Sequence, residues 1–254
     1  MWRSASAGRR REARRPPIAP DTRPPATARP TAASTTATET CALSATACDA
    51  EGVTAPAPNG PGKADCAAEE MVAVNLGRRY DIPTVALRYS IVQGPRQSVY
   101  NAYSGACRIF CLSYLQGMAP TLYEDGGAIR DYVNIDDVVD ANVLVLQDER
   151  AAGRVFNVGG GKAVTTREFS DIVMRQYGSA EPGVVTGEYR FGDTRHILSD
   201  ISALRALGWQ PRRTPADSVA AYAAWLKGMD GLDGVLAEAN ARMRSLGVVR
   251  KAGR

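Results

Sequence analysis

The chain has 254 residues, a formal net charge of +4 and 44% hydrophobic residues. It contains neither an apolar run of about 18 residues nor the apolar segment of a secretory signal, so we expect no membrane-spanning helix and a cytoplasmic protein. The charge is uneven: residues 1–62 hold eight arginines and five acidic residues, whereas the rest holds 23 basic and 22 acidic residues. The larger part therefore shows no basic patch in its sequence that would indicate nucleic-acid binding.

Residues 1–62 form a Pro-, Ala- and Arg-rich segment that we expect to be disordered. They contain nine prolines and only four residues of the Ile, Leu, Val, Phe and Met set. Such a segment buries too little apolar surface to offset the entropy lost on ordering. Its arginine cluster at residues 9–15 leaves open a contact with nucleic acid or an anionic membrane, but a solvated tail is the favoured interpretation. The prolines of residues 16–30 speak against the amphipathic helix of a transit peptide.

The cysteines indicate reduced thiols rather than a disulfide framework. Their number is odd, and no two of them are spaced as C-x-x-C. Cys107 and Cys111 lie four apart on a predicted helix, but no histidine or further cysteine lies near enough to complete a zinc site. We therefore predict no metal site.

From about residue 67 the sequence predicts regular structure. Residues 67–80 have apolar side chains at helical spacing, and Pro83 ends that helix. Residues 84–92 are a short apolar run typical of a buried strand, and a turn follows at 93–96. A helix, a short turn and a buried strand in succession favour a parallel α/β sheet.

The remaining elements follow the same rhythm. We predict a helix over 104–117, a strand over 121–124, a helix over 137–146 and a strand over 155–158. A capping box of Thr165 and Glu168 begins the next helix, Asp200 caps a helix over 201–207, and Thr214 with Pro215 starts the last predicted helix. We assign residues 228–254 to a tail of uncertain order.

Four segments of the body carry recognisable motifs. They are residues 87–97 (LRYSIVQGPRQ), 125–138 (DGGAIRDYVNIDDV), 155–161 (VFNVGGG) and 189–209, which contains RFGD, RH and LGW. In this order and with these gaps, they resemble the C-terminal part of the NAD-dependent sugar-nucleotide epimerases and dehydratases, which are extended short-chain dehydrogenases/reductases. The resemblance covers roughly residues 67–227. The family's basic residue three positions after Asp200 is replaced here by Ala203.

The resemblance implies both a fold class and a domain organisation. It implies an α/β protein, in which part of a doubly wound, Rossmann-type parallel sheet joins a smaller α/β substrate-binding domain. The C-terminal half of such an enzyme would occupy residues 63–227. In the family the strand at 84–92 pairs with strands of the cofactor half, so we expect one side of it to lack a partner here.

Arg130 and Arg190 are the first candidate site residues. The family's arginines at these two motif positions approach the pyrophosphate of the sugar nucleotide. A guanidinium fits this role because it directs two N–H donors at phosphate oxygens, which a lysine cannot match in geometry. The alternative is that each is a surface arginine paired with a nearby acid, Asp131 or Asp193.

Gln93 and Asn157 are the other candidate substrate-binding residues. Gln93 lies in the loop after a predicted strand, where α/β sites are built, at a position where the family has an aromatic residue. The family's substrate-contacting asparagine is replaced by Ile91, whose side chain cannot form hydrogen bonds. Asn157 either lies near the sugar or nucleotide or only forms the turn before the glycines. His196, the only histidine, is interpreted as structural rather than as a general base.

The features that carry the family's redox chemistry are absent from the sequence. The family uses a Tyr-x-x-x-Lys pair, in which the tyrosine exchanges a proton while hydride moves to or from NAD. The one lysine near the expected place is Lys63, and Asn59 stands four residues before it. The glycine-rich dinucleotide fingerprint and its acidic ribose partner are missing as well.

These absences shape the predicted function. We predict a truncated, catalytically inactive relative of these enzymes that does not bind NAD, the cofactor of the parent family. The alternative is a non-catalytic module that binds a UDP- or dTDP-linked sugar or a partner subunit, with a homo-oligomer left open. Catalysis would then need a separate chain. Nucleic-acid binding through the arginine-rich tail is the weakest hypothesis, because that tail lacks interleaved aromatic residues.

Overall fold

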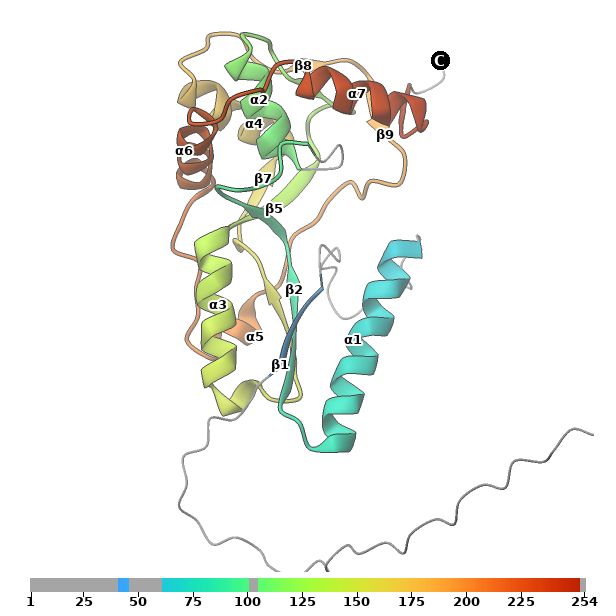
Figure 1. The fold of residues 1–254 in the computed structure, drawn as a ribbon, viewed down its shortest axis with the longest axis vertical. Coiled ribbons are helices and arrows are strands. Elements are labelled where there is room, and N and C mark those ends of the chain that lie inside the picture. Colours follow the sequence, from blue (N-terminus) through green and yellow to red (C-terminus); the bar gives the residue numbers. More distant parts are fainter. Residues whose placement is uncertain (1–40, 46–60, 101–104, 252–254) are drawn as a thin grey trace, which may run out of the picture. The chain divides into compact units, whose positions relative to one another are not determined.

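The computed structural model describes residues 41–45, 61–100 and 105–251, all within one compact unit that spans Thr38–Arg254 (Figure 1). Its helices are α1 (Pro61–Tyr80), α2 (Ala106–Leu115), α3 (Ile135–Gln147), a 3₁₀ turn (Glu149–Ala151), α4 (Thr166–Gln176), α5 (Ser202–Arg205), α6 (Pro215–Leu226) and α7 (Val235–Ser245). Its strands are β1 (Cys41–Ala45), β2 (Thr84–Tyr89), β3 (Ile91–Gln93), β4 (Thr121–Leu122), β5 (Ile129–Asn134), β6 (Val155–Val158), β7 (Ala163–Thr165), β8 (Val184–Val185), β9 (Glu188–Arg190) and β10 (Val249–Lys251). The predicted α/β class is confirmed.

The first sheet is parallel and has the order β1-β2-β6. Helices α1 and α3 flank it on opposite sides in Figure 1. The central strand β2 buries Val85 and Leu87, and β6 buries Phe156 and Val158 beside them. Strands buried in this way match the near-continuous apolar runs from which the sheet was predicted.

Strand β2 has a hydrogen-bonded neighbour on both sides, so the expectation that one side of it lacks a partner is wrong. The second neighbour is β1, in register from Cys41 opposite Thr84 to Ala45 opposite Arg88. Strand β1 lies within the segment predicted to be disordered, and helix α1 begins at Pro61, at the end of that segment. The rest of residues 1–62 lies outside the described residues, so its predicted disorder stays a prediction.

The second sheet has the order β3-β5-β7, with β3 parallel and β7 antiparallel to β5. The chain passes from the first sheet to the second at Ser90, which divides the single strand predicted over 84–92 into β2 and β3. Helices α2, α4 and α6 supply most of the core beside this sheet. Within it, the rings of Tyr132 and Phe169 stack with centroids 4.2 Å apart.

Local signals define the starts of two helices. Thr165 and Glu168 form the predicted capping box of α4, and Thr214 forms one with Asp217 at the start of α6. These side chains satisfy N–H groups that have no partner in the first helical turn. Asp200 accepts a hydrogen bond from the Ser202 N–H at 2.9 Å, but the N-cap of α5 is Ile201, so the predicted cap by Asp200 is wrong, and the helix is shorter than the predicted 201–207.

The C-terminal segment, which was predicted only as a tail of uncertain order, contains helix α7 and strand β10. Strand β10 pairs antiparallel with β9, and Val249 packs against Ala239 and Met243 of α7. The sequence hides the start of this helix because its N-cap is Gly234, which has a left-handed φ of +79° and no capping side chain.

Two negative findings hold for the described residues. None of their helices combines the length and the apolar character needed to cross a membrane. Nor do these residues bring together three His, Cys, Asp or Glu side chains in an arrangement that would hold a metal ion. Cys107 and Cys111 are both buried free thiols in α2.

Candidate functional site

A cavity of about 830 Å³ lies beside β5 and β9 and also has walls from α2 and α7. Its charged lining residues are Glu124, Arg130, Glu188, Arg190, Asp193 and Arg244. The structure therefore brings together the two predicted pyrophosphate ligands, Arg130 and Arg190, in the wall of one cavity. They lie 60 positions apart in the sequence, Arg130 on β5 and Arg190 on β9.

Arg130 is held in place by backbone carbonyl groups. Its Nη1 donates hydrogen bonds to the carbonyl of Ile129 at 2.9 Å and to that of Arg195 at 2.8 Å. Its side chain is 16% exposed. Because a guanidinium carries five N–H donors, these two hydrogen bonds leave others for a ligand.

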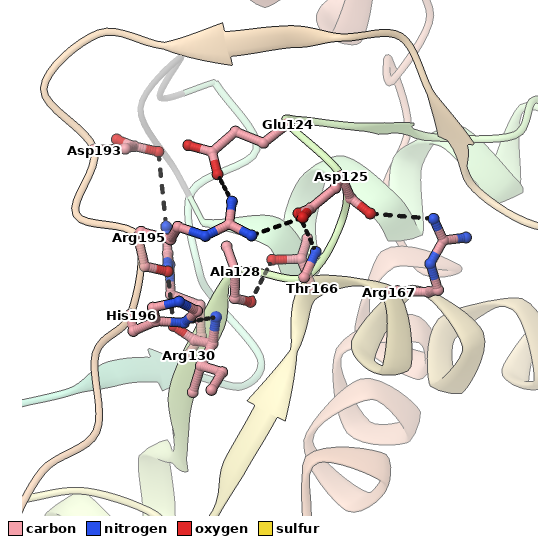
Figure 2. Close-up of polar contacts among 11 residues, drawn as sticks. Glu124, Asp125, Ala128, Arg130, Thr166, Arg167, Asp193, Arg195 and His196 are labelled. Atoms are coloured by element: carbon pink, nitrogen blue, oxygen red, sulfur yellow. Dashed lines mark hydrogen bonds and ion pairs between the residues drawn. The ribbon is translucent and has the colours of Figure 1, made fainter.

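Both arginines approach the carboxylate of Asp193. Asp193 Oδ2 lies 4.0 Å from Nη2 of Arg130 and 3.9 Å from Nε of Arg190, and Figure 2 shows Asp193 above Arg130. Nε of Arg190 is buried and has no hydrogen-bond partner. Two guanidinium groups thus share one carboxylate at distances too long for hydrogen bonds, which leaves a net positive charge and free donors for an anion.

The loop at 191–196 is tied to the turn at 124–127 by charged contacts (Figure 2). Arg195 pairs with the carboxylates of both Glu124 and Asp125, and Arg167 donates to the carbonyl of Asp125 at 3.2 Å. Hydrogen bonds from Arg195 and from the Gly127 N–H lower the pKa of Asp125 to about 2. The ion pairs of Arg195 with Glu124 and Asp125 therefore fix the position of the Arg195 carbonyl, which accepts a hydrogen bond from Arg130.

His196 belongs to the same loop and has a structural contact. Its Nδ1 accepts a hydrogen bond from the Ile129 N–H at 3.3 Å, and a bridge pairs the two residues. His196 is not among the residues that line the cavity. The contact supports the structural interpretation of this histidine.

Asp131 does not pair with Arg130, although one alternative considered from the sequence was that it would. It is fully buried, and its Oδ1 accepts hydrogen bonds from the N–H groups of Gly160 at 2.8 Å and Gly161 at 3.1 Å. Its Oδ2 accepts from the Ser199 N–H at 3.1 Å and from the Ser90 hydroxyl at 3.2 Å. Four donors satisfy this carboxylate, so its role is structural.

Gln93 and Asn157 do not line the cavity that contains the two arginines. Gln93 is 1% exposed, and neither its amide nitrogen nor its amide oxygen has a hydrogen-bond partner. Asn157 donates from Nδ2 to the carbonyl of Asp200 at 3.0 Å, which ties β6 to the segment before α5. Their assignment to substrate binding stays a prediction.

Several residues of the cavity wall were not predicted from the sequence. Gln97 lines the cavity and has a buried Oε1 without a partner. Burial raises the pKa of Tyr123, and the positive charge of Arg190 partly opposes that rise. Glu188 forms a bidentate pair with Arg244 at 2.8 and 3.1 Å, and these hydrogen bonds lower the pKa of the Glu188 carboxyl. Only the GPRQ motif, which contains Gln97, offered a sequence signal for any of them.

Of the two residues at the expected place of the catalytic pair, only Lys63 is within the described part of the chain. Lys63 belongs to the first turn of α1, whereas Asn59 lies outside the described residues.

Comparison with protein families confirms the expected resemblance. Residues 38–159 match the model of the NAD dependent epimerase/dehydratase family. The match begins three residues before strand β1 and runs through β6. It therefore includes part of the segment before residue 63, which the motif analysis did not connect with the family.

Individual relatives agree with this family. The dTDP-L-rhamnose 4-epimerase of Burkholderia thailandensis is 37% identical over 145 residues, which are 57% of this chain and 40% of that protein. The UDP-N-acetylglucosamine 4-epimerase of Methanobrevibacter ruminantium, solved with UDP-N-acetylmuramic acid, matches with a TM-score of 0.67 and 27% identity over 74% of this chain and 63% of that one. The UDP-glucose 4-epimerase of Thermus thermophilus, solved with NAD, matches with a TM-score of 0.60 and 28% identity over the same shares. This chain spans about half the length of the curated relatives that it matches.

Proposed function

From this match to the NAD dependent epimerase/dehydratase family, we propose that the chain binds a nucleotide-linked sugar whose pyrophosphate lies between Arg130 and Arg190. The observation that carries the proposal is the convergence of these two arginines on Asp193 in the wall of one cavity. A pyrophosphate offers oxygens to both guanidinium groups at once. Nε of Arg190 faces Asp193 at 3.9 Å but forms no hydrogen bond with a protein group.

The size of the cavity and the identity of the relatives suggest the ligand class. A volume of about 830 Å³ is in the usual range of small-molecule sites, and it is large enough for a nucleotide with an attached sugar. The relatives carry names of enzymes that act on dTDP- and UDP-sugars. We therefore propose a UDP- or dTDP-linked sugar as the ligand.

We further propose that this chain does not carry out the family's hydride transfer by itself. No tyrosine of the printed sequence has a lysine four residues later, and no glycine-rich dinucleotide fingerprint precedes the motifs. Without the tyrosine, no group stands ready to exchange a proton with the sugar hydroxyl. The chain would act as a binding module, with a second chain supplying the redox groups where catalysis occurs.

The free thiols of the described part favour a reducing compartment. Cys107 and Cys111 are buried and unpaired, as cysteines of cytoplasmic proteins usually are. We propose on this basis that the protein works in the cytoplasm.

Calorimetric titration of the full chain with UDP-glucose, dTDP-glucose and NAD, each in a separate experiment, tests the proposal. We expect binding of at least one sugar nucleotide and no binding of NAD. A parallel incubation of each sugar nucleotide with NAD, followed by chromatography, should show no new sugar. Stoichiometric NAD binding at micromolar affinity would refute the non-catalytic part, and absence of any sugar-nucleotide binding would refute the whole.

A further inference from the structure

The C-terminal segment 235–251, which contains α7 and β10, forms one wall of the cavity. Its lining residues are Leu236, Asn240, Met243, Arg244 and Val249. The segment lies beyond the part of the chain that resembled the family in its motifs, and beyond the residues matched by the family model. Its presence at the ligand cavity therefore needs a separate explanation.

The arginine pair lies between this segment and the ends of two parallel strands. Arg130 is two residues before Tyr132, which pairs with Ile91 of β3. Arg190 pairs with Val249 of β10. A ligand whose pyrophosphate spans both arginines would extend in one direction toward Ile91 and in the other toward the C-terminal segment.

The two directions differ in chemistry. Toward β3 the cavity is lined by Tyr89, Ser90 and Ile91, near the carboxyl ends of parallel strands, where α/β enzymes place the reacting group. Toward α7 it is lined by Leu236 and Met243, by the polar Asn240 and Arg244 of the same helix, and by Tyr123.

Helix α2, which adds Ile109 and Phe110 to the lining, contacts α7 as well. A flat nucleobase has two apolar faces, so the α7 side suits it better than it suits a sugar rich in hydroxyl groups.

We propose that the segment 235–251 is a cover that closes over the nucleoside part of the bound nucleotide sugar and that the Glu188–Arg244 pair holds it there. This inference rests on the proposed function, because it takes the pyrophosphate position from the arginine pair. It assigns to the segment a role in choosing the nucleotide rather than the sugar.

The contacts that fix the segment 235–251 lie next to Arg190. Glu188 and Arg190 belong to the same short strand, and β10 pairs with it so that Lys251 lies opposite Glu188. The two N–H···O bonds between Arg244 and Glu188 join α7 to β9, with the Glu188 side chain 10% exposed. Arg250 adds a second link, since its guanidinium lies 3.9 Å from the centre of the Phe191 ring.

The inference is tested with three probes and three variants of the full chain. The probes are UDP, dTDP and inorganic pyrophosphate, measured by calorimetry. The variants are Arg244→Ala, Arg190→Ala and Arg242→Ala, the last being an exposed residue of the same helix that does not line the cavity.

We expect Arg244→Ala to raise the Kd for UDP or dTDP by about five- to tenfold, because the base loses part of its apolar cover. The Kd for pyrophosphate should stay within about twofold of the wild-type value. Arg190→Ala should weaken both ligand classes, and Arg242→Ala should weaken neither. If Arg244→Ala weakens the binding of UDP and of pyrophosphate equally, or weakens neither, the proposal that the segment covers the nucleoside is wrong. A wild-type protein that binds neither would instead overturn the proposed function, and the cover with it.

A measurement on the wild-type protein guards against a variant that fails to fold. Hydrogen exchange followed by mass spectrometry should show that UDP slows exchange in residues 235–251, whereas pyrophosphate does not. Protection by UDP that is confined to the strands carrying Arg130 and Arg190 would contradict the inference.

Discussion

The Gly160 N–H donates a hydrogen bond of 2.8 Å to Oδ1 of Asp131, a carboxylate that is fully buried. This contact joins two motifs that lie about 30 residues apart, the RD pair of β5 and the glycine turn after β6. Adjacent residues of a strand point to opposite faces, so β5 directs Asp131 into the interior and Arg130 toward the cavity. The buried carboxylate thereby anchors the strand that carries a candidate ligand-binding arginine.

Gly160→Ala should destabilise the protein. A Cβ at this position would lie 2.1 Å from the backbone carbonyl oxygen of Tyr132, which cannot move without disturbing β5. We expect a loss of about 1 to 3 kcal/mol in the free energy of unfolding, measured by urea denaturation. Gly228→Ala is the matched control, because its Cβ would make only an ordinary 3.6 Å contact. Equal stability of the two variants would show that the turn after β6 adjusts freely.

Arg130→Lys should weaken sugar-nucleotide binding even though the charge is kept. A lysine cannot donate to the carbonyls of Ile129 and Arg195 and still present a planar fork to phosphate. Loss of one charge-assisted hydrogen bond is worth about 1.5 to 3 kcal/mol, or at least tenfold in Kd. Calorimetry with UDP-glucose measures it, with the exposed Arg212→Lys as control.

The same pair of arginines should make binding sensitive to salt. Affinity for UDP-glucose should fall between 50 mM and 500 mM sodium chloride, since part of the attraction between arginine and phosphate is screened. Arg190→Ala should bind more weakly and show a smaller dependence on salt. Equal affinity in the wild type, Arg130→Lys and Arg190→Ala would mean that both arginines are only ion-pair partners of Asp193.

Tyr132→Phe should leave the stability unchanged or raise it by up to about 1 kcal/mol. The Tyr132 hydroxyl is buried without a hydrogen-bond partner, and burial raises the pKa of this group well above its usual value. The hydroxyl loses its hydrogen bonds to water on folding and gains none in the protein, so its removal ends that cost. The ring still stacks on Phe169. Tyr114→Phe is the control, because its hydroxyl donates to the Glu181 carbonyl at 3.0 Å, and it should cost about 0.5 to 1.5 kcal/mol. If Tyr132→Phe lowers the free energy of unfolding by more than Tyr114→Phe does, the prediction is wrong.

Two shortened chains test the boundary predicted at residue 62. A chain that begins at residue 38 keeps β1, which pairs with β2 over five residues, and should melt at the temperature of the full chain. A chain that begins at residue 63 exposes one edge of β2 and should melt several degrees lower or aggregate. Differential scanning calorimetry gives both values. If the two shortened chains melt alike, β1 contributes nothing measurable, and the predicted boundary is adequate.

The sequence by itself determined those features whose cause lies within a few residues. The capping boxes at Thr165 and Thr214 were predictable because each satisfies N–H groups of the helix that follows it directly. The α/β class and strand β6 were predictable because buried parallel strands need short apolar runs. The family resemblance also lay in contiguous motifs, and the comparison with known proteins confirmed it.

Only the tertiary structure decided how distant residues meet. It turned Asp131 away from Arg130, buried Gln93, supplied β1 as a partner for β2 and placed residues of the C-terminal segment in the cavity wall. None of these outcomes has a local pattern in the sequence, because each depends on which surfaces remain unpaired once the sheets have formed. Arg130 and Arg190 were predicted as a pair from their resemblance to a family, but their approach to the common carboxylate of Asp193 results from the packing of strands far apart in the chain.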